Sequence, residues 1–290
     1  ATPAALYAHI DNRYEYKNIA NQLINSSIDI ALGGGKEFFD LNKINDTHHV
    51  LTAKESLQSN FDYSKKLIGL FDDDGIERSN EKPTQRQMTN FALNHLNKQC
   101  NGFFLMTEGS QIDWAAHDND ANKMIEEFKD FDSTIKDLIN FVNEDNETLL
   151  IVTSDHETGG LQILNQDNDK VVIQWGTGRH TSIPVGVHAY GPGAELFQGL
   201  MDNTDIHYKI LEAIDYKNLD NQSCNIWIKW SKTFFDNHLD ALKECVNLAS
   251  DEIMQIYNSD SFDQEEKSDG SPLTKADKRS NEIILNSLEK

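Results

Sequence analysis

The sequence predicts an α/β protein with a largely parallel central sheet, flanking helices and a helical C-terminal tail. Short apolar runs alternate with segments of helical periodicity, and the runs end at glycines or acidic residues. Glycine is frequent up to Gly199 and then absent until Gly270, so turns concentrate in the earlier part of the chain. Residues 1–215 are therefore expected to form the α/β domain, followed by a junction at 216–237 and a helical segment at 238–290.

Four short apolar runs have the composition of buried strands. They are IDIALGGG at 28–35, GFFLMT at 102–107, ETLLIVTSD at 147–155 and IPVGVHAYG at 183–191. Between the second and third runs, apolar residues recur at helical spacing: Met124, Ile125, Phe128, Ile135, Leu138, Ile139 and Val142. A strand, a helix and a strand in this order favour parallel strands joined by crossover helices.

The glycines Gly33 to Gly35 end the first of these runs and precede Lys36. A phosphate-binding turn at the start of a helix is one interpretation. The segment lacks the Lys-Ser/Thr pair of a P-loop and the spacing of a dinucleotide-binding motif, so a tight strand-to-helix turn is the expected structure. Further upstream, Arg13 is expected to lie in an early helix together with His9.

The last segment has a different pattern from the α/β part. Apolar residues recur there at alternating steps of three and four: Leu239, Leu242, Val246, Ala249, Ile253 and Ile256. This spacing predicts an amphipathic helix. An acidic stretch, the segment SPLTKAD at 271–277 and a second expected helix follow.

Composition and charge exclude several classes of protein. With 26 Lys and Arg residues against 48 Asp and Glu residues, the net charge is −22, which opposes nucleic-acid binding through a basic patch. A hydrophobic share of 38% can form a core, but no apolar run is long enough to predict a membrane span. The cysteines Cys100, Cys224 and Cys245 are too scattered for a disulfide scaffold or a thiolate zinc site.

Carboxylates and imidazoles follow three expected strands, where α/β proteins commonly build their sites. Asp113 and His117 are four residues apart, so one helical turn would direct both toward the same point, and His180 lies in a glycine-flanked loop. Two histidines and one aspartate are a ligand set of open zinc sites. Asp155 and His156 adjoin after another strand and suggest a second zinc ion.

Each of these features also has a plain structural explanation. An Asp-x3-His pair on a helix is usually a solvated polar pair, and Asp-His after a strand is commonly a turn or a cap. A single histidine such as His180 is more often hydrogen-bonded within the structure than bound to metal. The coincidence of such residues at three strand ends favours a metal site.

The same segments resemble the alkaline phosphatase family. Six segments occur in the family's order across about residues 1–215. They are ATPAALYAH with a following Arg, DIALGGG, GFFLMTEGSQIDWAAHDND, LLIVTSDHETGGL, RHT, and YGPGA with GLMDNTDI. The resemblance implies an incomplete alkaline phosphatase-like fold that lacks its N-terminal part. It also implies metal-dependent hydrolysis of small-molecule phosphate monoesters, a homodimer, and a periplasmic or extracellular location.

The resemblance further implies two zinc ions and one magnesium ion as cofactors. The ligands that it assigns are Asp113, His117 and His180 for the first zinc ion, Asp155 and His156 for the second, and Thr2 and Glu108 for magnesium. Arg13 would hold the phosphate group through its two-pronged guanidinium.

Two departures from the family pattern bear on activity. The family's nucleophilic serine and the aspartate shared by the second zinc ion and magnesium have no counterpart here, so the chain is expected to be an inactive fragment. Trp114 occupies a position where members carry Lys or His near phosphate. The alternatives are a related metal-dependent sulfatase, phosphodiesterase or mutase, and a non-catalytic zinc-binding fragment. Arg13 together with the EGSQIDWAAH motif favours the monoesterase.

The tail resembles a different family. Residues 238–290, above all SPLTKAD, are similar to the amino-terminal segment of a 3′(2′),5′-bisphosphate nucleotidase. An amphipathic helical appendage is the alternative. A gene fusion or an assembly artefact would each produce such a junction.

Overall fold

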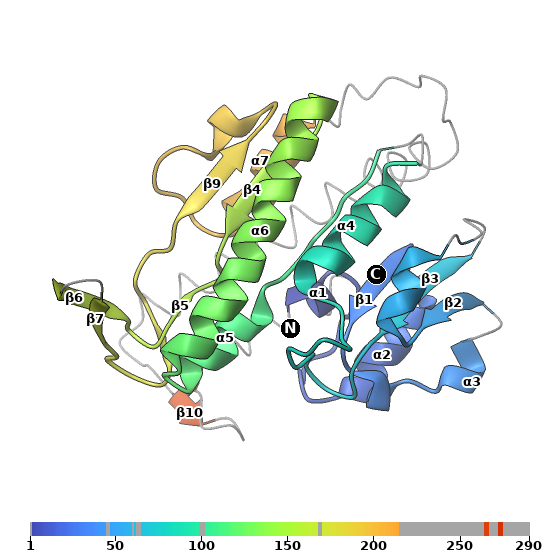
Figure 1. The fold of residues 1–290 in the computed structure, drawn as a ribbon, viewed down its shortest axis with the longest axis horizontal. Coiled ribbons are helices and arrows are strands. Elements are labelled where there is room, and N and C mark those ends of the chain that lie inside the picture. Colours follow the sequence, from blue (N-terminus) through green and yellow to red (C-terminus); the bar gives the residue numbers. More distant parts are fainter. Residues whose placement is uncertain are drawn as a thin grey trace. The chain divides into compact units, whose positions relative to one another are not determined.

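The computed structural model describes residues 2–44, 47–59, 61, 65–98, 102–167, 170–214, 264–266 and 272–274. The chain divides into two compact units, Ala1–Ile214 and Asp215–Lys290. All helices of the described residues lie in the first unit (Figure 1). No helix among them is long and apolar enough to cross a membrane.

A parallel three-stranded sheet forms the first part of this unit. Its strands lie in the order β1 (Ile30–Gly33), β3 (Lys66–Leu70) and β2 (His48–Leu51), with Ile68 opposite both Ala31 and Val50. The chain passes from β1 to β2 through the short helices η1 (Lys36–Phe38) and α3 (Leu41–Ile44). The buried side chains at the centre are Leu51, Leu67 and Phe71. The predicted α/β class with a parallel sheet and flanking helices is confirmed.

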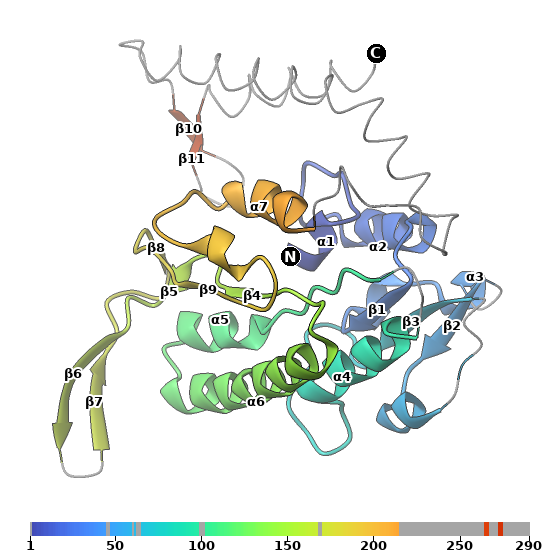
Figure 2. The ribbon, with the colours of Figure 1, turned by 90° about the horizontal axis from the view of Figure 1, so that it is seen from above.

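Helices α4 (Gln85–Leu96), α5 (Ser110–His117) and α6 (Ala121–Asp145) follow the sheet, and α6 packs against both α4 and α5 (Figure 2). Thr84 and Gln87 form a capping box at the start of α4. Asp120 caps α6 by accepting hydrogen bonds from two N–H groups of its first turn. The helix predicted from the apolar spacing at 121–142 is confirmed, although Ile125 and Phe128 of this pattern are exposed.

The strands after α6 pair in antiparallel fashion. The pairs are β4 (Leu150–Thr153) with β9 (Val187–Tyr190), β5 (Glu157–Thr158) with β8 (His180–Thr181), and β6 (Gln162–Asp167) with β7 (Lys170–Gln174). Between β4 and β9 the described chain forms the other two strand pairs, one nested inside the other, and no crossover helix. Strand β9 therefore runs antiparallel to β4. In the described residues, parallel pairing is thus confined to β1, β3 and β2.

Two expected elements differ from the structure. The run GFFLMT forms no strand, because none of its residues joins a ladder in the described part of the chain, and Phe104 is 64% exposed. Arg13 lies in a turn between α1 (Thr2–Ala5) and α2 (Tyr16–Asn25) and not in a helix. The side chain of Asn12 accepts a hydrogen bond from the Tyr14 N–H group and stabilises that turn.

The glycines at 33–35 form the tight turn that was the expected structure. Gly35 has a φ of 82°, which glycine adopts without strain. The backbone N–H groups of residues 35, 36 and 37 donate to the carbonyl oxygens of residues 74, 72 and 73 at 2.8, 2.9 and 3.3 Å. These N–H groups are the ones that a phosphate-binding turn would offer, so the phosphate interpretation is wrong.

Gly34→Ala is expected to destabilise the first unit, because a Cβ atom on Gly34 would lie 1.7 Å from the backbone oxygen of Asp74. The two loops cannot separate without breaking their hydrogen bonds, so the free energy of unfolding should fall by about 2–4 kcal/mol. Gly33→Ala is the matched control, since a Cβ atom there has no neighbour within 4 Å. Denaturant unfolding measures both variants, and equal stabilities would contradict the contact.

In the second unit, β10 (Gln264–Glu266) pairs with β11 (Pro272–Thr274) in antiparallel fashion. The junction at 216–237 and the helices predicted within 238–290 otherwise lie outside the described residues. The resemblance of this tail to a bisphosphate nucleotidase stays a prediction.

Candidate metal centre

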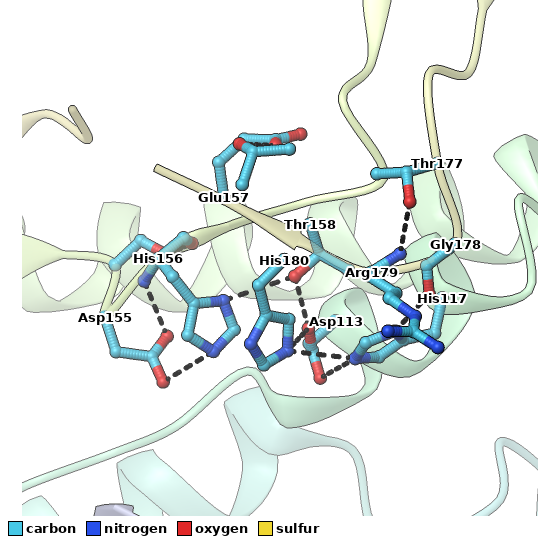
Figure 3. Close-up of polar contacts among 12 residues, drawn as sticks. Asp113, His117, Asp155, His156, Glu157, Thr158, Thr177, Gly178, Arg179 and His180 are labelled. Carbon is cyan, nitrogen blue, oxygen red and sulfur yellow. Dashed lines mark hydrogen bonds and ion pairs between the residues drawn. The ribbon is translucent and has the colours of Figure 1, made fainter. Parts of the chain in front are cut away.

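Asp113, His117 and His180 converge at one point (Figure 3). Helix α5 carries Asp113 and His117 one turn apart, and β8 supplies His180. One ligand atom from each residue lies within 4.8 Å of the other two. The Nε2 atoms of His117 and His180 are 3.0 Å apart, and they lie 3.5 and 3.7 Å from the two carboxylate oxygens of Asp113. The structure therefore brings together three of the residues that the sequence singled out.

The orientation of His117 fits a metal ligand. Its Nδ1 atom lies 2.8 Å from the backbone oxygen of Gly178. A carbonyl oxygen can only accept, so Nδ1 carries the hydrogen and Nε2 presents a lone pair toward His180 and Asp113. A ring nitrogen held in this way by a backbone carbonyl is typical of metal-binding histidines. Two imidazole nitrogens and a carboxylate around one point are donors that zinc prefers.

A glycine-rich loop holds His180 over the end of α5. The N–H group of Gly176 donates to the carbonyl oxygens of both Gly159 and Gly160, and that of Gly159 donates to the Arg179 carbonyl at 2.9 Å. A Cβ atom on Gly178 would lie 3.1 Å from the backbone oxygen of His117. Glycine at 178 therefore permits the close approach of this loop to α5.

Asp155 and His156 lie beside this cluster, just after β4. The His156 Nε2 atom is 3.2 Å from a carboxylate oxygen of Asp155, and the His156 ring stacks on that of His180 with centroids 3.5 Å apart. Within the part of the chain that the structure describes, no third candidate ligand joins this pair in a further group. Their assignment to a second zinc ion stays a prediction.

The surroundings of His180 favour its neutral form, which a metal ligand requires. Partial burial lowers the pKa of His180, and the neighbouring imidazole of His156 lowers it further, while Asp113 acts in the opposite direction. A neutral imidazole at position 180 can offer a lone pair at neutral pH.

The structure places the other residues of the expected site less closely to the candidate metal centre. Burial of its carboxyl group raises the pKa of Glu108, and the carboxylates of Asp155 and Asp113 act in the same direction. Thr2 lies in α1, and the guanidinium of Arg13 lies 5.9 Å from the centroid of the Tyr14 ring. Among the described residues, no hydrogen bond or ion pair joins Thr2 or Arg13 to the cluster. The roles of these three residues stay predictions.

The indole of Trp114 lies against the loop after β3. Two of its ring carbons are 2.9 Å from the position that a Cβ atom on Gly75 would take, and 45% of the residue is exposed. The glycine at 75 therefore makes room for the indole.

Sequence reasoning missed Thr158. Its hydroxyl group donates a hydrogen bond to Asp113 and lies 3.3 Å from the Nδ1 atom of His156 (Figure 3). One hydroxyl group thus contacts a residue of each predicted zinc site. Its only signal in the sequence is its place two residues after His156.

Thr158→Val is expected to weaken zinc binding to the folded chain about tenfold, because it removes the hydrogen bond that orients the Asp113 carboxylate. Thr158→Ser keeps the hydroxyl group and should bind zinc nearly as well as the wild type. Competition with a chromophoric chelator measures both affinities. Equal zinc binding by the valine variant would show that the hydroxyl group does not position Asp113.

Comparisons with known proteins show the family of the chain. The sequence model of the alkaline phosphatase family matches residues 1–169. Alkaline phosphatases 4 and 3 of Bacillus subtilis are 32% and 30% identical to the chain, and the alignments cover 73% and 74% of it. They cover 65% and 66% of the two relatives, so the chain spans just under two thirds of their length.

Solved structures give the same result. The alkaline phosphatase from the Antarctic bacterium TAB5 is 34% identical, with a TM-score of 0.67 over 74% of this chain and 68% of that one. The cold-active alkaline phosphatase of Shewanella sp. is 27% identical, with a TM-score of 0.67 over 73% of this chain and 72% of its own. Since the family model matches more than half of the 290 residues, the chain belongs to the alkaline phosphatase family.

Proposed function

We propose that this chain carries the metal-binding part of a phosphatase that hydrolyses phosphate monoesters with two zinc ions and one magnesium ion. The observation that carries the proposal is the convergence of Asp113, His117 and His180, with one ligand atom of each within 4.8 Å of the others. A variant of the TAB5 alkaline phosphatase holds Mg in its M3 site, which supports a role for divalent metals here.

Bound divalent metals would supply positive charge for the oxygens of a phosphate group and would activate an attacking oxygen. Among the chain's own residues, His117 and His180 present ring nitrogens to the site, and Asp113 contributes a carboxylate charge. Arg13 would hold two phosphate oxygens through its guanidinium. Such local positive charge is necessary for a phosphate dianion to bind a protein of net charge −22.

The proposal extends to the setting of the enzyme. It includes a periplasmic or extracellular location and a homodimer, with small phosphate monoesters as substrates. Nucleic acid is not among its partners, because the net charge of −22 repels a phosphate backbone. Every relative and structure named above is an alkaline phosphatase, which supports the monoesterase over a sulfatase or a phosphodiesterase.

A non-catalytic zinc-binding fragment is the second candidate function, because the nucleophilic serine implied by the resemblance has no counterpart in these residues. One experiment separates the two functions. The chain is assayed with a chromogenic phosphate monoester, zinc and magnesium, first alone and then fused to the upstream segment of a family member. Zinc-dependent turnover by the fusion supports the phosphatase, and zinc binding without turnover in either form supports the fragment.

A further inference from the structure

A single carboxylate holds together the two short strands that flank the candidate metal centre. One oxygen of Glu157 accepts a hydrogen bond from the Leu161 N–H group at 3.2 Å. The other accepts from the Gly160 N–H group at 3.2 Å and from the hydroxyl group of Thr181. Three donors from two segments of the chain thus converge on one side chain.

These hydrogen bonds connect the neighbours of two candidate ligands. Glu157 directly follows His156, and Thr181 directly follows His180. In the β5–β8 pair, Glu157 lies opposite Thr181 and Thr158 lies opposite His180. The hydrogen bond between the side chains of Glu157 and Thr181 therefore fixes the register that places the His180 ring on that of His156.

The same carboxylate also stabilises the turn that receives the loop of His180. Gly159 and Gly160 have φ angles of 91° and 57°, so this turn uses conformations that favour glycine. The Gly160 N–H group is occupied by Glu157, while the Gly159 N–H group donates to the Arg179 carbonyl. The turn therefore transmits the position of Glu157 to the residue directly before His180.

We propose that Glu157 is a positioning residue for the metal centre, whose carboxylate fixes His180 relative to Asp113 and His117 before a metal ion binds. The inference rests on the proposed function in one respect, which is that these three residues bind zinc. A site that is held in its binding geometry loses less conformational entropy when the ion binds. Partners that orient metal ligands typically contribute 10- to 100-fold to metal affinity.

The test measures zinc affinity of the full chain, first stripped of metal, by competition with a chromophoric chelator. The variants are Glu157→Gln, Thr181→Val and the double variant. Glutamine keeps one acceptor oxygen, so it cannot accept both from Leu161 and from the Gly160–Thr181 pair, and valine removes the Thr181 donor. We expect each single variant to bind zinc at least about tenfold more weakly. The double variant should be much less affected than the product of the two single effects, because both changes act on the hydrogen bonds of one carboxylate.

Two controls separate positioning from general stability. Thr148→Val removes a similar hydrogen bond, from a threonine hydroxyl group to the carboxylate of Asp145, at the end of α6. It should leave zinc affinity unchanged. Thr181→Ser keeps the donor and should restore the affinity that Thr181→Val loses. Denaturant unfolding of the metal-free variants shows whether each remains folded at the temperature of the titration.

The outcomes distinguish this inference from the proposed function. If the wild type binds zinc through Asp113 and the folded Glu157→Gln variant binds it equally well, the positioning role is overturned and the metal centre stands. If Asp113→Ala binds zinc as tightly as the wild type, the metal centre itself is wrong, and the role of Glu157 falls with it.

Discussion

Replacing His117 or His180 by alanine is expected to lower the zinc affinity of the folded chain about a hundredfold or more. Protein zinc sites reach roughly 10–16 kcal/mol of binding free energy, which corresponds to about 3 kcal/mol for each of four ligands. Both imidazoles belong to the same group of three candidate ligands, so either change leaves Asp113 with a single partner. Chelator competition gives the affinity, and elemental analysis gives the zinc content.

His207→Ala is the matched control for these two variants. His207 lies on α7 (Asp205–Ala213), where its ring contacts that of Tyr208 at a centroid distance of 5.2 Å. Its loss should leave zinc binding unchanged. Equal zinc content and affinity in the wild type and both cluster variants would show that these histidines hold no zinc.

The 290-residue chain by itself is expected to show no measurable phosphatase turnover. The resemblance assigns the attacking oxygen to a serine that has no counterpart here, and it assigns a further aspartate to the second zinc ion and magnesium. Catalytic residues that act as a unit are strongly non-additive, so the loss of one lowers the rate by several orders of magnitude. A chromogenic monoester at alkaline pH, with zinc and magnesium added, measures any remaining hydrolysis.

The control for this result is the Asp155→Ala variant of the same chain. Turnover by the wild-type chain that depends on zinc and disappears in Asp155→Ala would contradict the prediction. It would show that these residues contain a complete active site.

Local patterns in the sequence predicted the elements whose formation depends on local interactions. The apolar spacing specifies α6, and the run before Gly33 specifies β1. Pairing partners are not encoded locally, so the sequence could not show that β9 returns antiparallel to β4. For the same reason, the strand-like composition of GFFLMT did not reveal that this run joins no ladder among the described residues.

The candidate site was predictable to a similar extent. Helical periodicity placed Asp113 and His117 on one face of a turn. The coincidence of ligand residues at three expected strand ends suggested that His180 joins them, and the family resemblance then assigned all three to one zinc ion. Thr158 and Glu157 could not be found in this way, because their contacts reach across the chain to Asp113 and Thr181. Hydroxyl and carboxylate groups that support ligands have no periodic pattern by which the sequence would reveal them.

The hydrogen bonds between residues 35–37 and 72–74 have a consequence for protein engineering. Because three successive N–H groups of one loop meet three successive carbonyl oxygens of the other, the lengths of the two loops must match. An insertion after Gly35 would displace the N–H groups of residues 36 and 37 from their carbonyl acceptors and leave only the pair of Gly35 with Asp74 in place. Chimaeras with related enzymes should therefore exchange both loops together, as a single cassette, and not one loop at a time.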